Sequence, residues 1–514
     1  MVFLCYLSKG FYTIPMNKIP HNKIPLNVFW TLQQLQDAGY ESYIVGGCVR
    51  DILLDRDPND FDVTTNATPQ QIIEVFEQTD RRVVYENNFG TVGIINKDIE
   101  KNDVSYEIEI TPYRTESGYS DNRRPDEVLF SDSIHEDVKR RDFTINAMAY
   151  DPISEILVDD FGGFTDIEKR VIKTVGNAKE RFSEDALRIM RMVRFSAQLG
   201  FMGETETVTA LKELAPTLAN ISQERIRDEF IKLIDAPFAK DGMELMRMYG
   251  LLEYTVPELL EGVHCEQGGI HSFDVWTHLV KSLEHGTAKS YPLYVKLAAL
   301  FHDIGKPRTR RKANGRGSKE WTFYGHEVVG ANMTHAIMKR LKFPKDTIQK
   351  VVKLVRYHMF FSDPDAITLS AVRRMVKNVG KDLIWDLMDV RTCDRIGTGR
   401  PKEKPYRLRK YHAMIEEVLR DPISVAMLKI NGDIMIGEMG LQPGKKMGWV
   451  LHALLEEVLD DPTLNTREYL EKRALEMYLM SDEEIKKLGE AGKDKKDETE
   501  FRAVKQLHKK HKVD

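Results

Sequence analysis

Two aspartates, separated by a single residue, lie in the stretch NDFDVTT at residues 59–65, which otherwise has the composition of a β-strand. Side chains two residues apart on a strand point to the same face, so Asp60 and Asp62 are predicted to present two carboxylates together. A strand with this pair cannot be buried on that face unless a cation offsets the repulsion. Magnesium suits such a site, since one or two carboxylates and substrate phosphates usually hold it. Simple solvation of an acidic strand end is the alternative.

The residues before this pair favour the metal interpretation. The stretch IVGGCVRD, residues 44–51, reads as a strand, a Gly46–Gly47 turn and the start of a helix. Glycines let backbone amides approach a ligand closely, and a helix N-terminus favours anions. Arg50, one turn into the helix, can add a charge-assisted contact to phosphate. A plain tight turn would explain the glycines alone, but the combination predicts a site for a nucleoside triphosphate and its metals in phosphoryl or nucleotidyl transfer.

The pattern of elements predicts several domains in this chain of 514 residues. Strand and helix signals are mixed up to about residue 165, and periodic helices dominate afterwards. We predict a multidomain protein with an α/β head and an all-α remainder. The expected parts are a disordered leader (1–26), the head (27–165), a helical neck (166–250), a helical body (251–412), a helical tail (413–480) and a charged extension (481–514).

Composition excludes some classes of protein. The chain is 42% hydrophobic and 30% charged, which is ordinary for a globular protein. No apolar run approaches the roughly 20 residues that span a bilayer, and the N-terminus is a poor signal peptide. The four cysteines are scattered without metal-type spacing, which is typical of reduced thiols. We therefore expect no membrane partner and a cytoplasmic location. The sequence leaves the oligomeric state open.

The chain resembles class II tRNA nucleotidyltransferases and bacterial poly(A) polymerases. The motifs GGCVRD, NDFDV, FGTV, RRP, RRDFTINAMAYD and EDALRIMRMVRF occur in the order seen in that family. The resemblance covers residues 28–240 and continues more loosely to about 475. It implies a polymerase-β-like nucleotidyltransferase head. It also implies that Gly47 and Arg50 contact the triphosphate, that Asp60 and Asp62 bind magnesium, that Glu109 completes the acidic cluster, that Arg141 contacts the nucleotide, and that residues 119–125 form a flexible loop. Glu107 is expected on the same strand face as Glu109, so this assignment is open.

Base selection is expected on the stretch EDALRIMR. Asp185 and Arg188 are three residues apart, hence neighbours if the stretch is one helix. A salt bridge between them is the structural alternative; the resemblance implies instead that the pair faces the incoming base. Cytosine and adenine offer an amino donor to the carboxylate beside a ring-nitrogen acceptor for the guanidinium. Guanine and uracil would place a carbonyl against the carboxylate, at a cost of about 1–3 kcal/mol. The resemblance places Arg191 and Arg194 near the nucleotide as well.

Two activities share these motifs. The stretch NNFGTVGII at residues 87–95 looks like the CCA-adding branch, whereas the poly(A) branch tends to carry an arginine-rich segment there and a long arginine-rich extension. We therefore expect template-independent addition of CCA, or part of it, to tRNA from CTP and ATP. Poly(A) polymerase activity is the alternative, and the sequence does not separate full CCA addition from C-only or A-only addition.

A second metal constellation is predicted in the helical body. The stretch LFHDIGKP contains His302 and Asp303, with His278 upstream and Asp394 downstream. His326 and His358 lie between the last two. This order resembles the helical HD superfamily of metal-dependent phosphohydrolases. Imidazole and carboxylate ligands suit a transition metal or magnesium. The resemblance implies an activity on RNA-end phosphates, and an HD fold kept only for shape and RNA docking is the alternative.

Basic residues are concentrated in two stretches, although the net charge is −5. Residues 306–319 carry seven Lys or Arg and no acid, and residues 400–410 carry six against the single Glu403. Such patches are typical of phosphate-backbone binding, with a solvated face as the alternative. We expect both stretches to hold the tRNA backbone.

Overall fold

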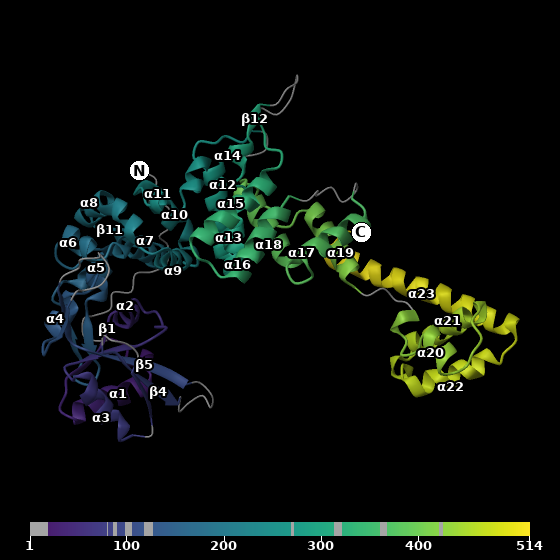
Figure 1. Ribbon diagram of the computed structural model, residues 1–514, viewed down its shortest axis with the longest axis horizontal. Coiled ribbons are helices and arrows are strands. Elements are labelled where there is room, and N and C mark those ends of the chain that lie inside the picture. Colours follow the sequence, from purple (N-terminus) through teal and green to yellow (C-terminus); the bar gives the residue numbers. More distant parts are fainter. Residues whose placement is uncertain are drawn as a thin grey trace. The chain divides into compact units, whose positions relative to one another are not determined.

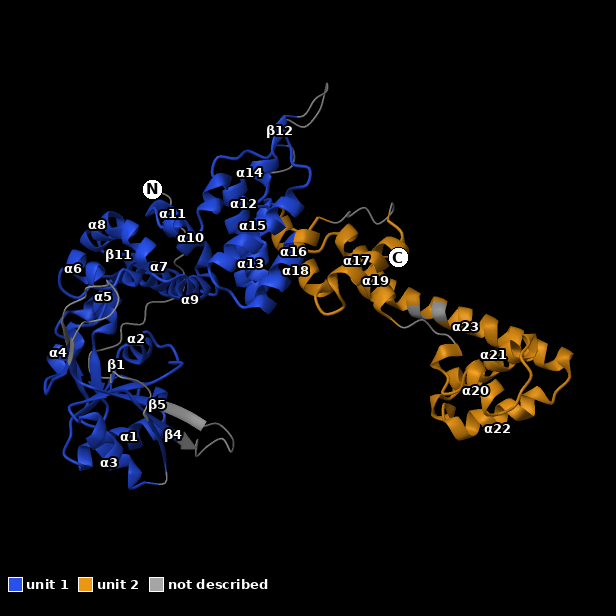
Figure 2. Cartoon of the chain, viewed as in Figure 1, with its two compact units in different colours: residues 1–355, 397–399 blue, residues 356–396, 400–514 orange. Residues whose placement is uncertain are grey.

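The chain divides into two compact units in the computed structural model (Figure 2). The first contains residues 1–355 and 397–399, and the second contains residues 356–396 and 400–514. The structure describes residues 19–79, 81–85, 90–97, 105–117, 127–268, 272–312, 321–359, 367–420 and 425–513. Each unit has its own core and is described by itself.

A seven-stranded mixed sheet forms the centre of the α/β head. Its strand order is β3-β4-β5-β2-β1-β8-β9. Strands β2 and β5 run parallel, whereas the other neighbouring strands are antiparallel. The central parallel pair places the start of β2 opposite the middle of β5, where Asp62 faces Glu109. The strands are β1 (Ser42–Val45), β2 (Asp62–Thr65), β3 (Arg82–Tyr85), β4 (Val92–Lys97), β5 (Ser105–Pro112), β8 (Ala149–Asp151) and β9 (Ile156–Val158).

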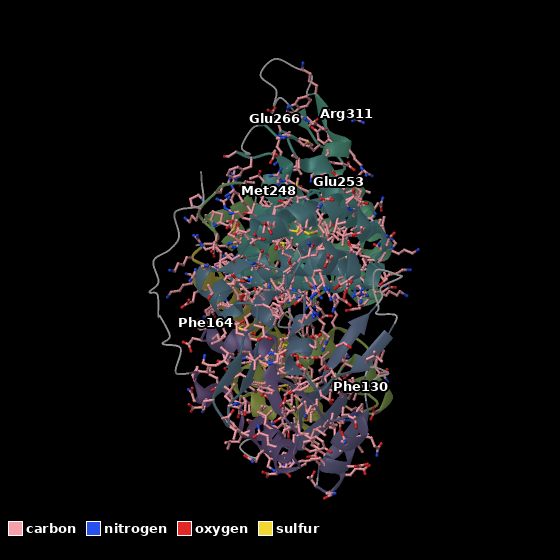
Figure 3. All side chains as sticks on the ribbon, turned by 90° about the vertical axis from the view of Figure 1, so that its left-hand side faces the viewer. Phe130, Phe164, Met248, Glu253, Glu266 and Arg311 are labelled. Carbon is pink, nitrogen blue, oxygen red and sulfur yellow. The ribbon has the colours of Figure 1, made fainter. Side chains whose placement is uncertain are left out.

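Short helices and a hairpin complete the head (Figure 1). In α1, Val28, Leu32 and Leu35 are fully buried, which confirms the helix that their spacing predicts. Helix α3 begins at a capping box between Thr68 and Gln71. Phe130, labelled in Figure 3, ends the small β6–β7 hairpin. These elements are α1 (Leu26–Asp37), α2 (Gly47–Leu53), α3 (Pro69–Glu77), α4 (Ile134–Lys139), β6 (Arg114–Ser117), β7 (Glu127–Phe130) and the 3₁₀ turn Thr144–Asn146.

After the head, the first unit is almost entirely helical, as expected. Within the described residues, the strands beyond β9 are two residues long: β10 (Val171–Ile172), β11 (Met202–Gly203), β12 (Arg311–Lys312) and β13 (Trp321–Thr322). The helices are α5 (Gly163–Lys169), α6 (Ala178–Glu184), α7 (Leu187–Leu199), α8 (Thr205–Leu214), α9 (Gln223–Ile234), α10 (Ala239–Met248), α11 (Leu252–Thr255), α12 (Val275–Ala288), α13 (Leu293–Phe301), α14 (Lys306–Thr309), α15 (His326–Arg340) and α16 (Lys345–Tyr357).

Helices also build the second unit. Its main apolar cluster includes Met435, Val450, Leu454, Leu470 and Ile485, all fully buried. Helix α23 begins at a capping box between Ser481 and Glu484. A Cβ at Gly492 would lie 2.2 Å from the carbonyl oxygen of His452, so the glycine permits close packing of α23 on α21. The helices are α17 (Leu369–Val379), α18 (Ile384–Gly397), α19 (Tyr406–Leu419), α20 (Gly432–Gly437), α21 (Lys445–Asp460), α22 (Arg467–Tyr478) and α23 (Asp482–His511).

Several predicted segments lie outside the described residues: residues 1–18 of the expected leader, the expected flexible loop 119–125, and residues 313–319 of the first basic stretch. The described end of the leader contacts the head, where Lys23 pairs with Asp55 at 2.8 Å. The other domain boundaries remain predictions. No helix in the described ranges combines the length and the apolarity needed to cross a bilayer.

Candidate active site

Three acidic residues lie on or just before the two parallel strands of the head. Asp62 is the first residue of β2, and the parallel register places it opposite Glu109 on β5. Both side chains are exposed, as is Asp60, while the intervening Phe61 is buried in the core. Asp60 lies just before the strand rather than in it, because β2 begins at Asp62. The alternation of exposed and buried positions nevertheless extends through all three residues.

The electrostatics of Asp62 suit a bound cation. Crowding by protein atoms raises the pKa of Asp62 above its usual value, and the Asp60 carboxylate raises it further, whereas Arg141 opposes both. Oxygen donors in this arrangement match the ligand preference of magnesium. The register also favours Glu109 over Glu107, because β2 pairs with β5 only from Glu109 onward. These acids therefore fit the divalent ion that the sequence predicts.

The glycine turn and Arg141 lie beside these acids. Gly46 has a φ of +84°, a conformation that favours glycine. A Cβ at Gly46 would also lie 2.9 Å from Nη1 of Arg141, so the guanidinium rests against the turn. Nη2 of Arg141 donates to Asp137 at 3.2 Å. Arg141 thus lies against the glycine turn and close enough to Asp62 to oppose the rise in its pKa.

Arg50 lies close to the turn but is engaged by protein groups. A Cβ at Gly47 would be 3.6 Å from Nη2 of Arg50. The guanidinium donates to both oxygens of Asp51 and, at 2.7 Å, to Oδ1 of Asn146. It also stacks over the Phe195 ring at 5.2 Å. The structure therefore places Arg50 between the glycine turn and α7, where it connects the head to the neck.

The predicted helix EDALRIMR is interrupted at Asp185. Its φ and ψ of −140° and 103° are extended, and it separates α6 from α7. Asp185 and Arg188 are consequently not adjacent on one helix face, and the expectation of a continuous helix is wrong. Oδ1 of Asp185 accepts from the Leu187 amide at 3.1 Å, so Asp185 uses its side chain to start α7 rather than to continue α6.

Asp185 and Arg188 each have a different partner. Arg225 on α9 donates to both oxygens of Asp185, at 3.2 and 2.8 Å. Arg188 pairs with Glu184 and donates to the carbonyl of Arg181 at 2.9 Å. The two side chains are therefore positioned independently and do not neutralise each other. The simple salt bridge that competes with base recognition does not form in the described structure.

Arg191, which is half-buried, and Arg194, which is buried, belong to an ion-pair network on α7. Arg191 donates to Asp142 at 2.7 Å, and Arg194 donates to Glu229 at 2.9 Å while covering the Phe195 ring at 3.6 Å. Burial alone would raise the pKa of Asp142, but Arg191 and the Asn146 amide outweigh it and lower the pKa to about 2. Arg191 therefore fixes the position of Asp142 at the junction of head and neck. Asp142 directly follows Arg141 in the chain.

The histidine cluster of the body converges on Asp303. Nε2 of His278 lies 2.9 Å from Nε2 of His302 and 3.1 Å from Oδ2 of Asp303. Nε2 of His326 lies 3.1 Å from Oδ1 of Asp303. Nζ of Lys306 lies 2.6 Å from Oδ2. All these residues are buried. Burial opposes ionisation of Asp303, but Lys306 and the histidines hold its pKa well below the usual value.

Hydrogen bonds orient these imidazoles as ligands. Nδ1 of His302 lies 2.8 Å from the carbonyl of Ala299, and Nδ1 of His326 lies 2.7 Å from the carbonyl of Phe323. A carbonyl only accepts, so in the neutral ring Nδ1 carries the hydrogen and Nε2 presents a lone pair. Lone pairs of imidazole and carboxylate thus face one point, which fits a metal ion. Asp394 is buried on α18 in the second unit and pairs with Arg391, so its membership of this ligand set stays a prediction.

Three family models match successive parts of the chain. A model described as "Poly A polymerase head domain" matches residues 42–173. One described as "Probable RNA and SrmB- binding site of polymerase A" matches residues 200–262, and an HD domain model matches residues 268–396. A CCA-adding enzyme of Leuconostoc mesenteroides is 34% identical over 452 residues, which cover 87% of this chain and 94% of that protein. The chain belongs to the CCA-adding enzyme family.

Other members of the CCA-adding enzyme family agree with this placement. A CCA-adding enzyme of Geobacillus sp. (strain WCH70) is 47% identical over 223 residues, or 43% of this chain and about half (52%) of the relative's length. The crystal structure of Bacillus stearothermophilus CCA-adding enzyme in complex with CTP is 27% identical, with a TM-score of 0.55, covering 88% of this chain and 96% of that chain. The head and HD models together imply dependence on divalent metal.

The sequence analysis did not identify several residues that position the predicted site residues by hydrogen bonds in this member of the CCA-adding enzyme family. Asp142 and Asn146 both lie in RRDFTINAMAYD, and Arg225 lies in QERIRDEF. Polar residues embedded in apolar periodic segments were the available signal, because such residues are buried only when they are paired. Their partners lie 35–96 residues away in the chain, as for Arg194 with Glu229 and Arg50 with Asn146, so no local spacing identifies them.

Proposed function

We propose that this chain adds CCA, or part of it, to the 3′ end of tRNA, using CTP and ATP. The observation that carries the proposal is the parallel register of Asp62 with Glu109, next to an arginine that rests on the glycine turn. The named activity of the Leuconostoc relative, matched over nearly its whole length, supports it.

Within this mechanism, Asp60, Asp62 and Glu109 would hold magnesium. When bound, the ion would lower the pKa of the acceptor hydroxyl and neutralise charge on the leaving group. The protein's own residues bind and align the reactants: Arg141 and the glycine turn hold the triphosphate. The acceptor 3′-hydroxyl releases its proton to solvent as its oxygen forms a bond to the α-phosphorus, the bond from that phosphorus to the bridging oxygen breaks, and pyrophosphate leaves. Alignment of the hydroxyl with the α-phosphate would supply most of the remaining rate enhancement.

Asp185 and Arg188 would select the base without a template. An ionised carboxylate has about four acceptor sites. Arg225 and the Leu187 amide use three of them in the described structure, two on Oδ1 and one on Oδ2. A site on Oδ2 therefore remains for the exocyclic amino group of cytosine or adenine. Glu184 keeps Arg188 on the same junction between α6 and α7, where its guanidinium can donate to the ring nitrogen.

The product pattern tests this proposal against its alternatives. The protein is incubated with a tRNA that lacks CCA, with CTP and ATP singly and together, and products are resolved at single-nucleotide length. We expect defined addition of three nucleotides, or of one type where the chain performs only part of the reaction. Open-ended adenosine addition would instead establish a poly(A) polymerase. Absence of incorporation with every combination would refute the nucleotidyltransferase.

We also propose that the HD body is a metal-dependent phosphohydrolase that acts on phosphates at RNA ends. The convergence of imidazole and carboxylate lone pairs on one buried point supports it. His278, His302, Asp303 and His326 would hold a transition metal or magnesium, and Asp394 would complete the set. RNA with a 2′,3′-cyclic or terminal phosphate is the test substrate, with a panel of divalent metals. No release of phosphate with any metal would leave the HD fold as a docking scaffold.

The proposed substrates and thiols also suggest where the protein works. Cys48, Cys265 and Cys393 are buried and free in the described structure, which is compatible with a reducing compartment. We propose a cytoplasmic location, where tRNA, CTP and ATP are available. Tagged protein recovered in a membrane or exported fraction would contradict this.

A further inference from the structure

Charge is unevenly distributed along α23, the last helix of the second unit. Residues 482–500 contain eight Asp or Glu and five Lys, whereas residues 501–513 contain five Lys or Arg and no Asp or Glu. Cations near a helix C-terminus are favoured by the helix dipole. The basic end could therefore exist only to stabilise the helix, and a second observation is needed to assign it another role.

That observation is the docking of the helix end on the second basic stretch. Nε and Nη2 of Arg409 donate to the carbonyls of His511 and Lys512, at 2.9 and 3.2 Å. Its Nη1 donates to the carbonyl of Lys404 at 3.0 Å. One guanidinium thus joins the last turn of α23 to the segment before α19. Figure 1 shows the C-terminus beside α19.

An acidic residue of α19 reinforces this docking. Glu416 accepts from Lys510 at 2.8 Å and pairs with His511 at 3.0 Å. Val513, just after the helix, is buried. Two segments about a hundred residues apart in sequence are therefore held together by carbonyl, ionic and apolar contacts. The fixed end of α23 is inconsistent with a freely moving tail at these residues.

The docking unites exposed cations and leaves no exposed acid among them. Lys402, Lys404 and Arg407 are exposed on one segment, and Lys505, Lys509 and Lys512 are exposed on the other. No Asp or Glu within residues 400–417 or 501–513 is exposed. Glu416, the acid nearest the junction, is already engaged by Lys510 and His511. Lys505 and Lys509 are four residues apart on one face of α23, and Lys512 follows directly as the C-cap residue of that helix.

We propose that these six residues form one surface, here called the α19–α23 surface, that binds the phosphate backbone of duplex RNA. The proposal rests on the proposed function, because that function supplies an RNA substrate. Clustered exposed cations with no exposed acid among them match the regular charge of a nucleic-acid backbone. Recognition there is by charge and shape and carries no base specificity. It extends the predicted role of residues 400–410 to a helix that the sequence treated as a charged extension.

The test compares two triple variants of the same helix. Lys505→Gln, Lys509→Gln and Lys512→Gln together remove the helix contribution to the surface. Lys486→Gln, Lys487→Gln and Lys493→Gln remove the same charge from exposed positions in the acidic half. A third variant replaces Lys505, Lys509 and Lys512 by arginine. Binding of a tRNA lacking CCA and of an unrelated RNA hairpin is measured by fluorescence anisotropy across salt concentrations, with circular dichroism to verify helix content.

We expect the first variant to bind both RNAs roughly 10–100-fold more weakly. The slope of log affinity against log salt concentration should become shallower by about one for each lysine that no longer neutralises a phosphate. The control and the arginine variant should bind like the natural protein. Equal weakening in the first variant and the control would overturn the proposal. The proposal would also be overturned if the first variant lost helix content as well as affinity and the arginine variant did not bind like the natural protein. The lysines would then only stabilise the helix.

The outcomes also separate this surface from the nucleotidyltransferase itself. Incorporation of CMP depends on the head, whereas anisotropy reports binding alone. Full RNA binding by the natural protein without any incorporation would refute the proposed activity and leave the α19–α23 surface standing. Incorporation together with an RNA affinity that does not change when the lysines are replaced would refute the α19–α23 surface and leave the proposed activity standing.

Discussion

The head carboxylates and the histidine cluster of the body stabilise their charged side chains in opposite ways. Asp60 and Asp62 are exposed at the beginning of β2, and Glu109 is exposed on the neighbouring parallel strand β5. His302 and Asp303 are buried at the end of α13 and are met by groups from three other helices, α12, α14 and α15. Water can solvate the first set when no ion is bound, whereas the second must satisfy its charge with protein groups such as Lys306.

This contrast teaches how each site is completed. The exposed carboxylates of the head can stay partly hydrated before a cation arrives with a triphosphate, although neighbouring protein atoms raise the pKa of Asp62. A buried cluster must be assembled by the fold before metal binds, and the imidazoles of His302 and His326 are each oriented by a backbone carbonyl. We therefore expect that neutralising a single acid in the head lowers the rate of nucleotide incorporation. Neutralising the acid of the HD cluster should instead lower its metal content.

The largest effect is expected in the head. Asp62→Asn removes one of the acids that would hold magnesium, so CMP and AMP incorporation should fall at least about 10³-fold. Incorporation is measured with radiolabelled CTP or ATP. Asp132→Asn, at an exposed position of the head, is the matched control and should retain activity. Near-normal incorporation by Asp62→Asn would refute the metal assignment.

A large effect on metal content is expected in the body. Asp303→Asn should weaken metal binding at least about 100-fold, more than loss of an outer-shell partner, because Asp303 is the acid on which the cluster converges. Metal is measured by elemental analysis after gel filtration, with Asp346→Asn, an exposed position on α16, as control. Nucleotide incorporation should persist, and its loss together with the metal would show that the body acts only as a scaffold.

A smaller effect concerns stability at the junction between head and neck. Asp142 has a folded pKa of about 2, below its ordinary 3.8, and one pKa unit is worth about 1.36 kcal/mol. Asp142→Asn should therefore lower the free energy of unfolding by about 2 kcal/mol at neutral pH. Because the folded pKa is depressed, this contribution is complete above about pH 4 and is lost as pH falls towards 2. Urea unfolding of both proteins between pH 7 and pH 3 measures it. A difference that is the same at pH 3 as at pH 7 would contradict the linkage to Arg191.

The smallest effect is expected in base selection. Arg225→Gln removes the end-on partner of Asp185, so the ratio of CMP to UMP incorporation should fall by about tenfold, equivalent to about 1.4 kcal/mol. Arg225→Lys should restore part of the ratio, whereas Lys232→Gln on the same helix should not change it. A uniform loss of rate with all nucleotides and no change in ratio would assign Arg225 to structure alone.

Local patterns were enough for much of the fold. The alternation around Phe61 predicts which side of the strand carries the acids, and the spacing of Val28, Leu32 and Leu35 predicts α1. The ordered motifs are sufficient to indicate the family that the comparisons establish. Such signals succeed because strand and helix periods relate neighbouring residues directly.

Local patterns failed where a single residue takes an extended conformation and interrupts a helix. The spacing of Asp185 and Arg188 predicts a shared helix, yet Asp185 caps α7 and ends α6. An aspartate can hydrogen-bond to the backbone in place of continuing a helix. Arg225, 40 residues away, stabilises that choice.

The sequence by itself determined the periodic elements, the order of the motifs and the residue types available for metal, phosphate and base. Only the tertiary structure decided which distant groups meet: Glu109 with Asp62, Arg225 with Asp185, and the end of α23 with Arg409. The physical reason is that periodicity acts between near neighbours in the chain. Pairing of buried charges and strand register, in contrast, are fixed by the packing of whole elements.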